Sequence, residues 1–205
     1  MIYKIFKRCF DFTAALLLFI CISPLFLVLA LMVRIKLGSP IFFKQARSGK
    51  GGKTFYIRKF RTMTDDRDAE GKLLPDEQRM TKFGGWLRSS SLDELPELLN
   101  IISGDMAVIG PRPLHPRYND YYTEYEKSRF KVRGGLIPPE SLYFDSFVTW
   151  DKQLKYEADY ANNVSLLLDI RLLVSVFKTI FKRTETDYGS YTREALDVER
   201  SKKDE

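Results

Sequence analysis

Two adjacent carboxylates, Asp93 and Glu94, form the part of the chain best suited to chemistry. They lie in the run SSSLDELPELL, with Arg88 just upstream. A carboxylate in such a setting could attack phosphorus or bind Mg²⁺. A structural explanation competes with this one, because Ser91 followed three residues later by Glu94 matches a capping box at the start of a helix. The cluster alone leaves both open.

A second candidate is the tetrapeptide Gly110-Pro111-Arg112-Pro113. Two prolines restrict the backbone on either side of one arginine, and a rigidly presented guanidinium suits bidentate phosphate recognition. A solvent-facing turn would have the same composition.

Cations two residues apart mark a third candidate, Lys59-Phe60-Arg61-Thr62-Met63. On a strand, Lys59 and Arg61 would share one face. They could bind a phosphate, or they could protect an exposed sheet edge by their charge.

Composition narrows the chemistry further. The chain has one histidine, His115, and its two cysteines, Cys9 and Cys21, have no metal or redox spacing. A histidine-based triad is therefore poorly supported, and any metal should be a hard, oxygen-ligated cation such as Mg²⁺. The net charge of +6 favours anionic headgroups or a phosphorylated substrate as partners. We expect no nucleic-acid partner, since no helix-turn-helix, zinc-finger or RNP pattern occurs.

The element that must place these residues near their substrate is the uncharged stretch Phe12–Val33, which Ser23-Pro24 interrupts at its middle. As a straight helix it would be about 33 Å long, enough to cross a bilayer core of about 30 Å. Proline removes a helical hydrogen bond, and the Ser23 hydroxyl could satisfy a freed carbonyl. Basic residues flank both ends, whereas a spanning helix normally has them on one side. A kinked single span and a segment that returns to the same face both remain open. No signal-peptide cleavage site follows the stretch.

The remaining sequence predicts a mainly helical α+β domain. We expect a small β-hairpin from the runs 41–43 and 54–57 around a Gly-rich turn, and a surface loop over 65–78. Helical patterns cover 81–87, 94–102, 117–130 and 166–182. The last is amphipathic and suits either a core-covering helix or one in the membrane interface. We expect ordered loops over 104–116 and around 134–139, and a charged, loosely ordered tail over 184–205.

Together these motifs resemble one family. SLDELPELLN followed by SGDMAVIGPRP, and preceded by KFRTM and a Pro-broken apolar segment, is similar to the bacterial sugar transferases, which are monotopic phosphoglycosyl transferases. The resemblance runs from about Lys7 to Arg183. It implies transfer of a sugar 1-phosphate from a UDP-sugar to polyprenyl (undecaprenyl) phosphate with release of UMP, as the first membrane step of glycan assembly, and a need for Mg²⁺.

The resemblance also implies roles for individual residues. Asp93 matches the nucleophile that forms an aspartyl-phosphosugar intermediate, and Glu94 matches its partner; both are candidates for the metal. Arg112 matches a phosphate-binding arginine. Four further candidates for substrate or phosphate binding are Lys59, Arg61, Arg88 and the late acidic residue Asp169.

Family membership would place the protein in one leaflet, on the cytoplasmic face of a bacterial inner membrane. Residues 1–37 would be a re-entrant helix-break-helix, 38–183 the catalytic domain and 184–205 the tail. The chain departs from the family pattern over Gly134–Glu140, where members commonly have Pro-Gly-Ile-Thr-Gly. A catalytically altered relative, or a membrane-tethered scaffold that binds anionic lipid, is therefore the alternative. The sequence leaves open the sugar, the glycan and whether a homodimer forms.

Overall fold

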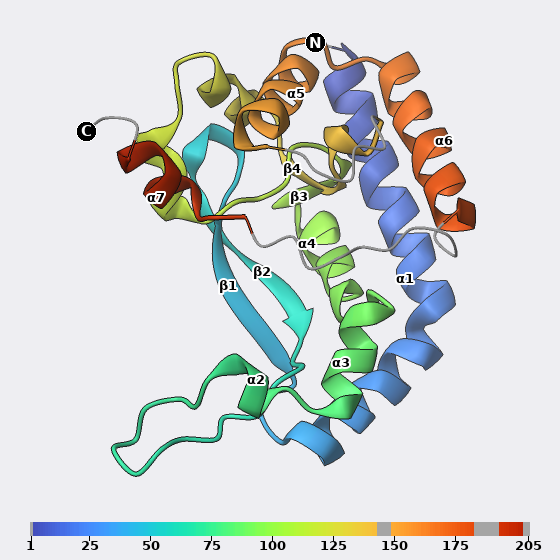
Figure 1. Cartoon of the computed structure of the whole chain (residues 1–205). Helices are drawn as coiled ribbons and strands as arrows, with labels where there is room; N and C mark the ends of the chain where they lie inside the picture. Colours follow the sequence, from blue (N-terminus) through green and yellow to red (C-terminus); the bar gives the residue numbers. More distant parts are fainter. Residues whose placement is uncertain (1, 143–148, 183–192, 203–205) are drawn as a thin grey trace. The chain divides into compact units, whose positions relative to one another are not determined.

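The protein folds into two compact units. The computed structural model describes residues 2–142, 149–182 and 193–202. The first unit contains Met1–Asp11, Ala46–Phe55 and Gly104–Glu205, and the second contains Phe12–Gln45 and Tyr56–Ser103. Helices predominate, with two small two-stranded sheets (Figure 1). The expected mainly helical α+β class is confirmed.

Helix α1 (Ile2–Leu37) contains the apolar stretch and continues through Pro24. Ser23 Oγ donates a hydrogen bond to the carbonyl oxygen of Ile20 at 2.8 Å. That carbonyl is the one which would have accepted from residue 24 had it carried an N–H. Figure 1 shows α1 as a single ribbon that changes direction part-way along its length. The expected break is therefore a bend within one helix, because the serine hydroxyl supplies the missing bond.

Among the residues described, α1 is the one helix that is long and apolar enough to cross a membrane, by length and composition alone. Only 17% of its most apolar stretch is buried. Apolar side chains such as Leu17, Leu27 and Leu31 are more than half exposed. A surface of this kind is consistent with membrane association.

The next two strands form the β-hairpin that the sequence predicts. Strands β1 (Phe42–Ser48) and β2 (Thr54–Phe60) form a two-stranded sheet, and the turn η1 (Lys50–Gly52) connects them. Gly51 and Gly52 have φ of +70° and +71°, a conformation that residues with a Cβ rarely adopt. The hairpin expectation is confirmed.

The core of the second unit is apolar and includes one side of α1. Buried Phe26, Leu29 and Val33 pack with Phe60 and Leu87. The elements that follow β2 are α2 (Asp76–Arg79), α3 (Lys82–Ser89), η2 (Leu92–Glu94) and α4 (Glu97–Ser103). Figure 1 shows α3 and α4 alongside α1, in agreement with this core. Helix α3 approaches the chain at Thr62 so closely that a Cβ on Gly84 would lie 1.7 Å from the Thr62 carbonyl oxygen.

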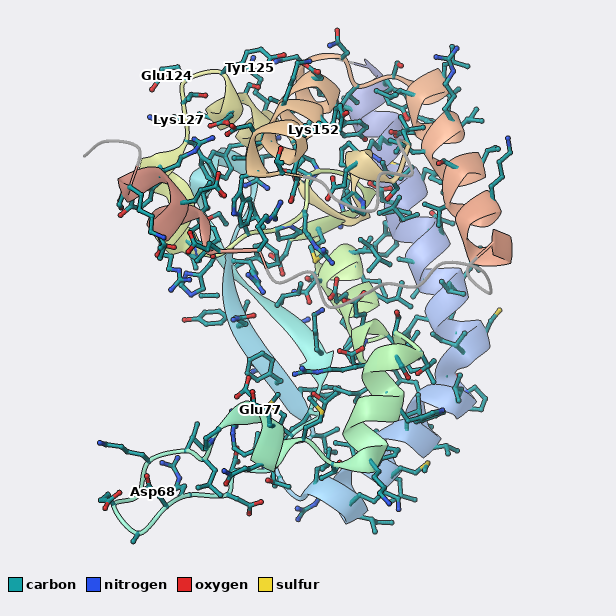
Figure 2. The ribbon with its side chains drawn as sticks, viewed as in Figure 1. Asp68, Glu77, Glu124, Tyr125, Lys127 and Lys152 are labelled. Atoms are coloured by element: carbon teal, nitrogen blue, oxygen red, sulfur yellow. The ribbon has the colours of Figure 1, made fainter. Side chains whose placement is uncertain are left out.

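The expected surface loop lies between β2 and α2. It narrows at the bridges Met63–Met80 and Arg67–Leu73. Asp68 accepts from the backbone N–H of Lys72 at 2.8 Å. Figure 2 shows Asp68 at the outer end of this loop.

Two strands of the first unit lie where we expected loops. Strand β3 (Met106–Ile109) pairs in parallel with β4 (Gly134–Ile137), with Met106 opposite Gly134. Each strand is only four residues long and is bordered by glycine or proline. The loop expectations for 104–116 and 134–139 were wrong at these positions, because the pairing partner is remote in sequence.

The single helix expected over 117–130 is in fact two short 3-10 helices, η3 (Pro116–Tyr121) and η4 (Glu126–Lys131). Thr123 and Glu126 exchange bonds: Glu126 Oε2 accepts from the Thr123 N–H at 2.8 Å, and Thr123 Oγ1 accepts from the Glu126 N–H at 3.3 Å. This exchange separates η3 from η4 by fixing the chain between Thr123 and Glu126, where η4 begins. Figure 2 shows Glu124, Tyr125 and Lys127 close together in this part of the chain.

The rest of the first unit is helical: η5 (Pro139–Leu142), α5 (Trp150–Asn162), α6 (Leu166–Lys182) and α7 (Leu196–Ser201). Leu196 is fully buried, and Trp150 Nε1 donates to the Glu194 carbonyl at 2.9 Å. The expectation of a loosely ordered tail was thus wrong for residues 193–202, because α5 supplies packing that the tail alone could not predict. Residues 184–192 of that tail lie outside the described residues.

Helix α6 has the amphipathic pattern that we expected, with one qualification. It buries Asp169, Leu172 and Ser175, yet its exposed side is also apolar. The exposed apolar residues are Leu166, Leu167, Ile170 and Val174. The helix therefore both covers a core and presents an apolar face.

Candidate active site

Asp93 lies in η2, the short 3-10 turn that precedes α4, and it is 9% exposed. Ser91, the residue that precedes η2, has φ of +56°, and within the described structure its side chain makes no capping hydrogen bond. A capping box requires an extended residue whose side chain accepts such a bond. The capping explanation of this cluster was therefore wrong, and the geometry favours another role for the carboxylates.

Lys59 organises the acidic residues around Asp93. Its Nζ lies 2.5 Å from Glu94 Oε1 and 3.2 Å from Glu97 Oε1. Lys59 comes from β2 and Glu97 from the first turn of α4, where a carboxylate is also favoured by the helix dipole. The structure thus brings the predicted residues Lys59, Asp93 and Glu94 together within one unit.

Asn100 fixes α4 against β2 so that this arrangement is held. Its side chain is fully buried; Oδ1 accepts from the Arg58 N–H at 3.0 Å, and Nδ2 donates to the Tyr56 carbonyl at 2.8 Å. Sequence reasoning missed Asn100 and Glu97. Their spacing held a signal, since Glu97 follows Asp93 by four residues and Asn100 follows it by seven, so that both share its side of a helical pattern.

The charge state of Asp93 depends on opposing influences. Burial raises the pKa of its carboxyl above the usual value, and neighbouring Glu94 raises it further. Lys59 and Arg88 act in the other direction by favouring the carboxylate. A carboxylate that is raised in basicity yet faces cations is suited to attack an electron-poor centre.

The other two predicted cations of the second unit, Arg88 and Arg61, have different hydrogen-bond partners. Arg88 has an exposed side chain, and its Nε donates to Thr62 Oγ1 at 3.0 Å. Arg61 is 8% exposed, and its guanidinium contacts three oxygens, those of Ser39 O, Met63 O and Asp65 Oδ2, at 2.7 to 2.9 Å. Arg61 therefore braces the backbone after β2. Its place among the substrate-binding candidates stays a prediction, and these contacts would have to change for the guanidinium to bind substrate.

Arg112 belongs to the first unit, where β3 ends. Its residue is exposed, while its backbone N–H donates to Glu157 Oε1 at 3.0 Å. The atypical stretch Gly134–Glu140 contributes β4 to this place, and a Cβ on Gly134 would lie 2.6 Å from Pro113 Cγ. The atypical stretch Gly134–Glu140 thus packs against Gly110–Pro113, the tetrapeptide that we predicted to bind phosphate.

Asp169 lies in α6 and binds the start of α1. Tyr3 Oη donates to Asp169 Oδ2 at 2.5 Å, Lys7 Nζ lies 3.0 Å from the same oxygen, and Tyr160 Oη donates to Oδ1 at 2.7 Å. Its carboxylate is 6% exposed. Oδ2 of Asp169 therefore anchors the start of α1 and Oδ1 bonds α5, while the assignment of Asp169 to substrate binding stays a prediction.

The acidic side chains around Asp93 bear on whether the protein can hold Mg²⁺. Within the part of the chain that the structure describes, no group of three or more His, Cys, Asp or Glu side chains is arranged to hold a metal. Mg²⁺ is usually bound by one or two carboxylates together with substrate phosphates and water, rather than by a complete protein cage. The adjacent carboxylates of Asp93 and Glu94 fit that mode.

Comparison with known proteins decides the family. A model described as "Bacterial sugar transferase" matches residues 2–183. The chain belongs to the bacterial sugar transferase family. This sugar transferase is thus an enzyme of the phosphoglycosyl transferase class, and that expectation is confirmed.

Several relatives of this sugar transferase have names that bear on its role. An uncharacterized sugar transferase, EpsL of Bacillus subtilis, is 46% identical over 169 residues, covering 82% of this chain and 84% of EpsL. The UDP-glucose:undecaprenyl-phosphate glucose-1-phosphate transferase of Klebsiella pneumoniae is 34% identical, covering 88% of this chain but 40% of its own length. The enzyme of the same name from Caulobacter vibrioides is 40% identical over 192 residues, covering 88% and 70%.

Proposed function

We propose that this protein transfers a sugar 1-phosphate from a UDP-sugar to undecaprenyl phosphate and releases UMP, as the first membrane step of glycan assembly. The observation that carries the proposal is the buried Asp93 carboxyl beside the Lys59–Glu94–Glu97 cluster, in a chain of this family. The names of two relatives include UDP-glucose and undecaprenyl phosphate. UDP-glucose is therefore the first donor to test.

The transfer proceeds in two displacements. An Asp93 carboxylate oxygen attacks the phosphorus that carries the sugar, and the bond from that phosphorus to the bridging oxygen breaks, so that UMP departs with the electron pair. A phosphate oxygen of undecaprenyl phosphate then attacks the same phosphorus. The acyl-phosphate bond breaks, which regenerates the Asp93 carboxylate. The covalent intermediate divides one difficult transfer into two easier steps.

Positive charge must offset the negative charge at each displacement. Mg²⁺, held by Asp93 and Glu94 with substrate phosphate oxygens, would supply part of it when bound. Lys59 pairs with Glu94 and Glu97, and both Lys59 and Arg88 favour the carboxylate form of Asp93, against the rise in its pKa that burial causes. We assign Arg112 to a substrate phosphate, because a guanidinium between two prolines is presented with little freedom.

Membrane placement follows from the acceptor. The phosphate of a polyprenyl phosphate lies at the membrane surface while its tail remains in lipid. We propose that α1 enters one leaflet from the cytoplasmic face and returns to it at the Ser23-Pro24 bend. The exposed apolar face of α6 suits the interface.

Release of UMP tests the proposal. Purified full-length protein in detergent is given undecaprenyl phosphate, Mg²⁺ and each of a panel of UDP-sugars. We expect UMP release that requires both substrates at steady state and disappears on chelation of Mg²⁺. A membrane-tethered scaffold or an inactive relative would bind anionic vesicles without releasing UMP from any donor, and that result would overturn the proposal.

A further inference from the structure

The backbone of Arg112 is held at both of its polar groups by one buried ion pair. Its N–H donates to Glu157 Oε1 at 3.0 Å, and its carbonyl oxygen accepts from Arg129 Nη2 at 2.5 Å. The two partners face each other, with Arg129 Nη2 2.7 Å from Glu157 Oε2. The pair therefore contacts the Arg112 backbone from both sides while the Arg112 side chain stays exposed.

The flanking prolines make this arrangement necessary. Pro111 and Pro113 have no N–H, so the N–H of Arg112 is the only backbone donor in that tripeptide. Proline restricts the residue before it to extended conformations but does not by itself orient the peptide plane against the rest of the unit. Glu157 and Arg129 supply that orientation.

The surroundings confine the pair tightly. Arg129 and Glu157 side chains are 3% and 0% exposed. Arg129 Nη1 donates to Tyr122 Oη at 2.7 Å, and Gln153 Nε2 donates to Glu157 Oε1 at 3.0 Å. Removing two charges from water is costly and offsets most of their attraction, so a buried ion pair contributes little net stability. A contribution to the position of another group explains its presence better.

We propose that Arg129 and Glu157 are positioning residues for Arg112, which hold its peptide groups so that the guanidinium is presented to a substrate phosphate. The inference rests on the proposed function of Arg112. Neither residue contacts substrate in this account; both act through the backbone of Arg112.

The central test measures UMP release by Glu157→Gln, which removes the charge facing Arg129 but keeps an oxygen for the Arg112 N–H. We expect the turnover number to fall about tenfold, as for loss of a charge-assisted contact in the transition state. Arg129→Lys should behave alike, because an ammonium cannot bond Tyr122, Glu157 and the Arg112 carbonyl together.

A matched control is available in the same unit. Glu126 also pairs with an arginine, Arg200, at 2.6 Å, and it also accepts a backbone N–H, that of Thr123, at 2.8 Å. The contacts of Glu126 do not include Arg112. Glu126→Gln should lower the melting temperature as much as Glu157→Gln does, yet leave the turnover number within about twofold of wild type.

A double-mutant cycle separates positioning from general stability. In the Arg112→Ala background, Glu157→Gln should cause no further loss of UMP release, since its effect passes through Arg112. If Glu157→Gln lowers UMP release in the Arg112→Ala background by the same factor as in wild type, the positioning proposal is overturned. The positioning proposal is also overturned if Glu157→Gln has wild-type turnover while Arg112→Ala is impaired. In that second case the proposed function of the protein would still stand. Wild-type turnover in Arg112→Ala would instead remove the phosphate role of Arg112.

Amide exchange gives a readout that does not depend on activity. Between Gly110 and Leu114, Arg112 carries the only exchangeable amide, so overlapping peptides in hydrogen-exchange mass spectrometry report on it alone. Glu157→Ala should speed its exchange and Glu126→Gln should not. Unchanged exchange in a folded Glu157→Ala protein would show that the carboxylate does not hold this peptide.

Discussion

At Asp93, burial and charge act in opposite directions on a single carboxyl group. Burial raises its pKa, while Lys59 and Arg88 favour the ionised form. The net effect is a raised pKa of the Asp93 carboxyl, and a more basic carboxylate is the stronger nucleophile once it is ionised. The residue type could be read from the sequence, but this balance depends on side chains from β2 and α3.

Asparagine at position 93 tests the nucleophile directly. Asp93→Asn should abolish UMP release, because an amide cannot form the acyl phosphate, while the melting temperature should change little. Mass spectrometry of the wild-type peptide 89–100, after acid quench with UDP-sugar and Mg²⁺ but no acceptor, should show an added phosphosugar.

Glu94→Gln serves as the comparison for Asp93→Asn. If Asp93→Asn retains turnover and Glu94→Gln does not, the roles of the two carboxylates are reversed. An active enzyme in both variants would exclude the covalent mechanism.

Glu140, from the atypical stretch, is predicted to make stability depend on pH. Burial, with the nearby Glu157, raises the pKa of Glu140 from 4.5 to about 7. The folded state then binds more protons than the unfolded state between these values, so the free energy of unfolding falls as the pH rises from 4.5 to 7. Glu140→Gln should therefore raise the melting temperature at pH 8 and change it little at pH 4.5.

Glu126 is the comparison for Glu140, because its pKa is shifted in the opposite direction. Burial alone would raise its pKa, but hydrogen bonds from Arg200 and Thr123 outweigh burial and leave the pKa below the usual value. Glu126→Gln should lower the melting temperature at pH 8 and have less effect in acid. A Glu140→Gln protein that melts no higher than wild type at pH 8 would contradict the assignment.

At the scale of elements, α1 shows how one side chain keeps a proline-containing helix intact. The Ser23 hydroxyl bonds the Ile20 carbonyl that Pro24 cannot serve. The result is a bend and not a break, because the hydrogen-bond ladder is restored by a side chain. The re-entrant path in a membrane stays a proposal that depends on this bend.

Straightening α1 should change its path in the membrane. In a Cys9→Ser, Cys21→Ser background, single cysteines near positions 3 and 40 should both resist a membrane-impermeant label added from the periplasmic side. Ser23→Ala with Pro24→Ala restores the backbone bond and should expose one of the two positions to label. Labelling near position 3 in the otherwise native helix would show that α1 spans the bilayer.

At the scale of the whole molecule, the C-terminal residues are part of the first unit rather than an appendage. Leu196 is fully buried in the cluster that contains Trp150 and Leu154. Arg200 pairs with Glu126 and Asp151 at 2.6 and 3.1 Å. The segment therefore stabilises the unit that carries Arg112.

Truncation of Leu196 measures that contribution. Leu196→Ala should lower the free energy of unfolding by about 2–4 kcal/mol, the usual cost of a cavity in a packed core. Val198, 45% exposed on the same helix, is the control, and Val198→Ala should cost less than about 0.5 kcal/mol. Equal effects in thermal unfolding would show that α7 is not docked as described.

Prediction from sequence succeeded where the signal was local. The hairpin of β1 and β2, the surface loop and the amphipathic character of α6 all follow from patterns within a few residues, although the last residues of the predicted loop over 65–78 belong to α2. It failed for β3 and β4, because each strand is only four residues long and β4 begins with two glycines, so that neither is recognised without its partner. Among the site residues, the sequence predicted substrate or phosphate binding for Lys59, Arg61 and Asp169. It did not predict that Lys59 pairs with Glu94, that Arg61 bonds the Ser39 carbonyl or that Asp169 pairs with Lys7.

The sequence by itself determined the family, the apolar anchor and the chemical types at the site, because motifs and hydropathy are properties of neighbouring residues. Only the tertiary structure decided which charges face which. Lys59 contacts carboxylates 35 residues away or more, and Glu157 reaches the Arg112 N–H across 45 residues. Charge pairing and burial depend on distance in space, and a linear pattern does not contain that distance until the chain has folded.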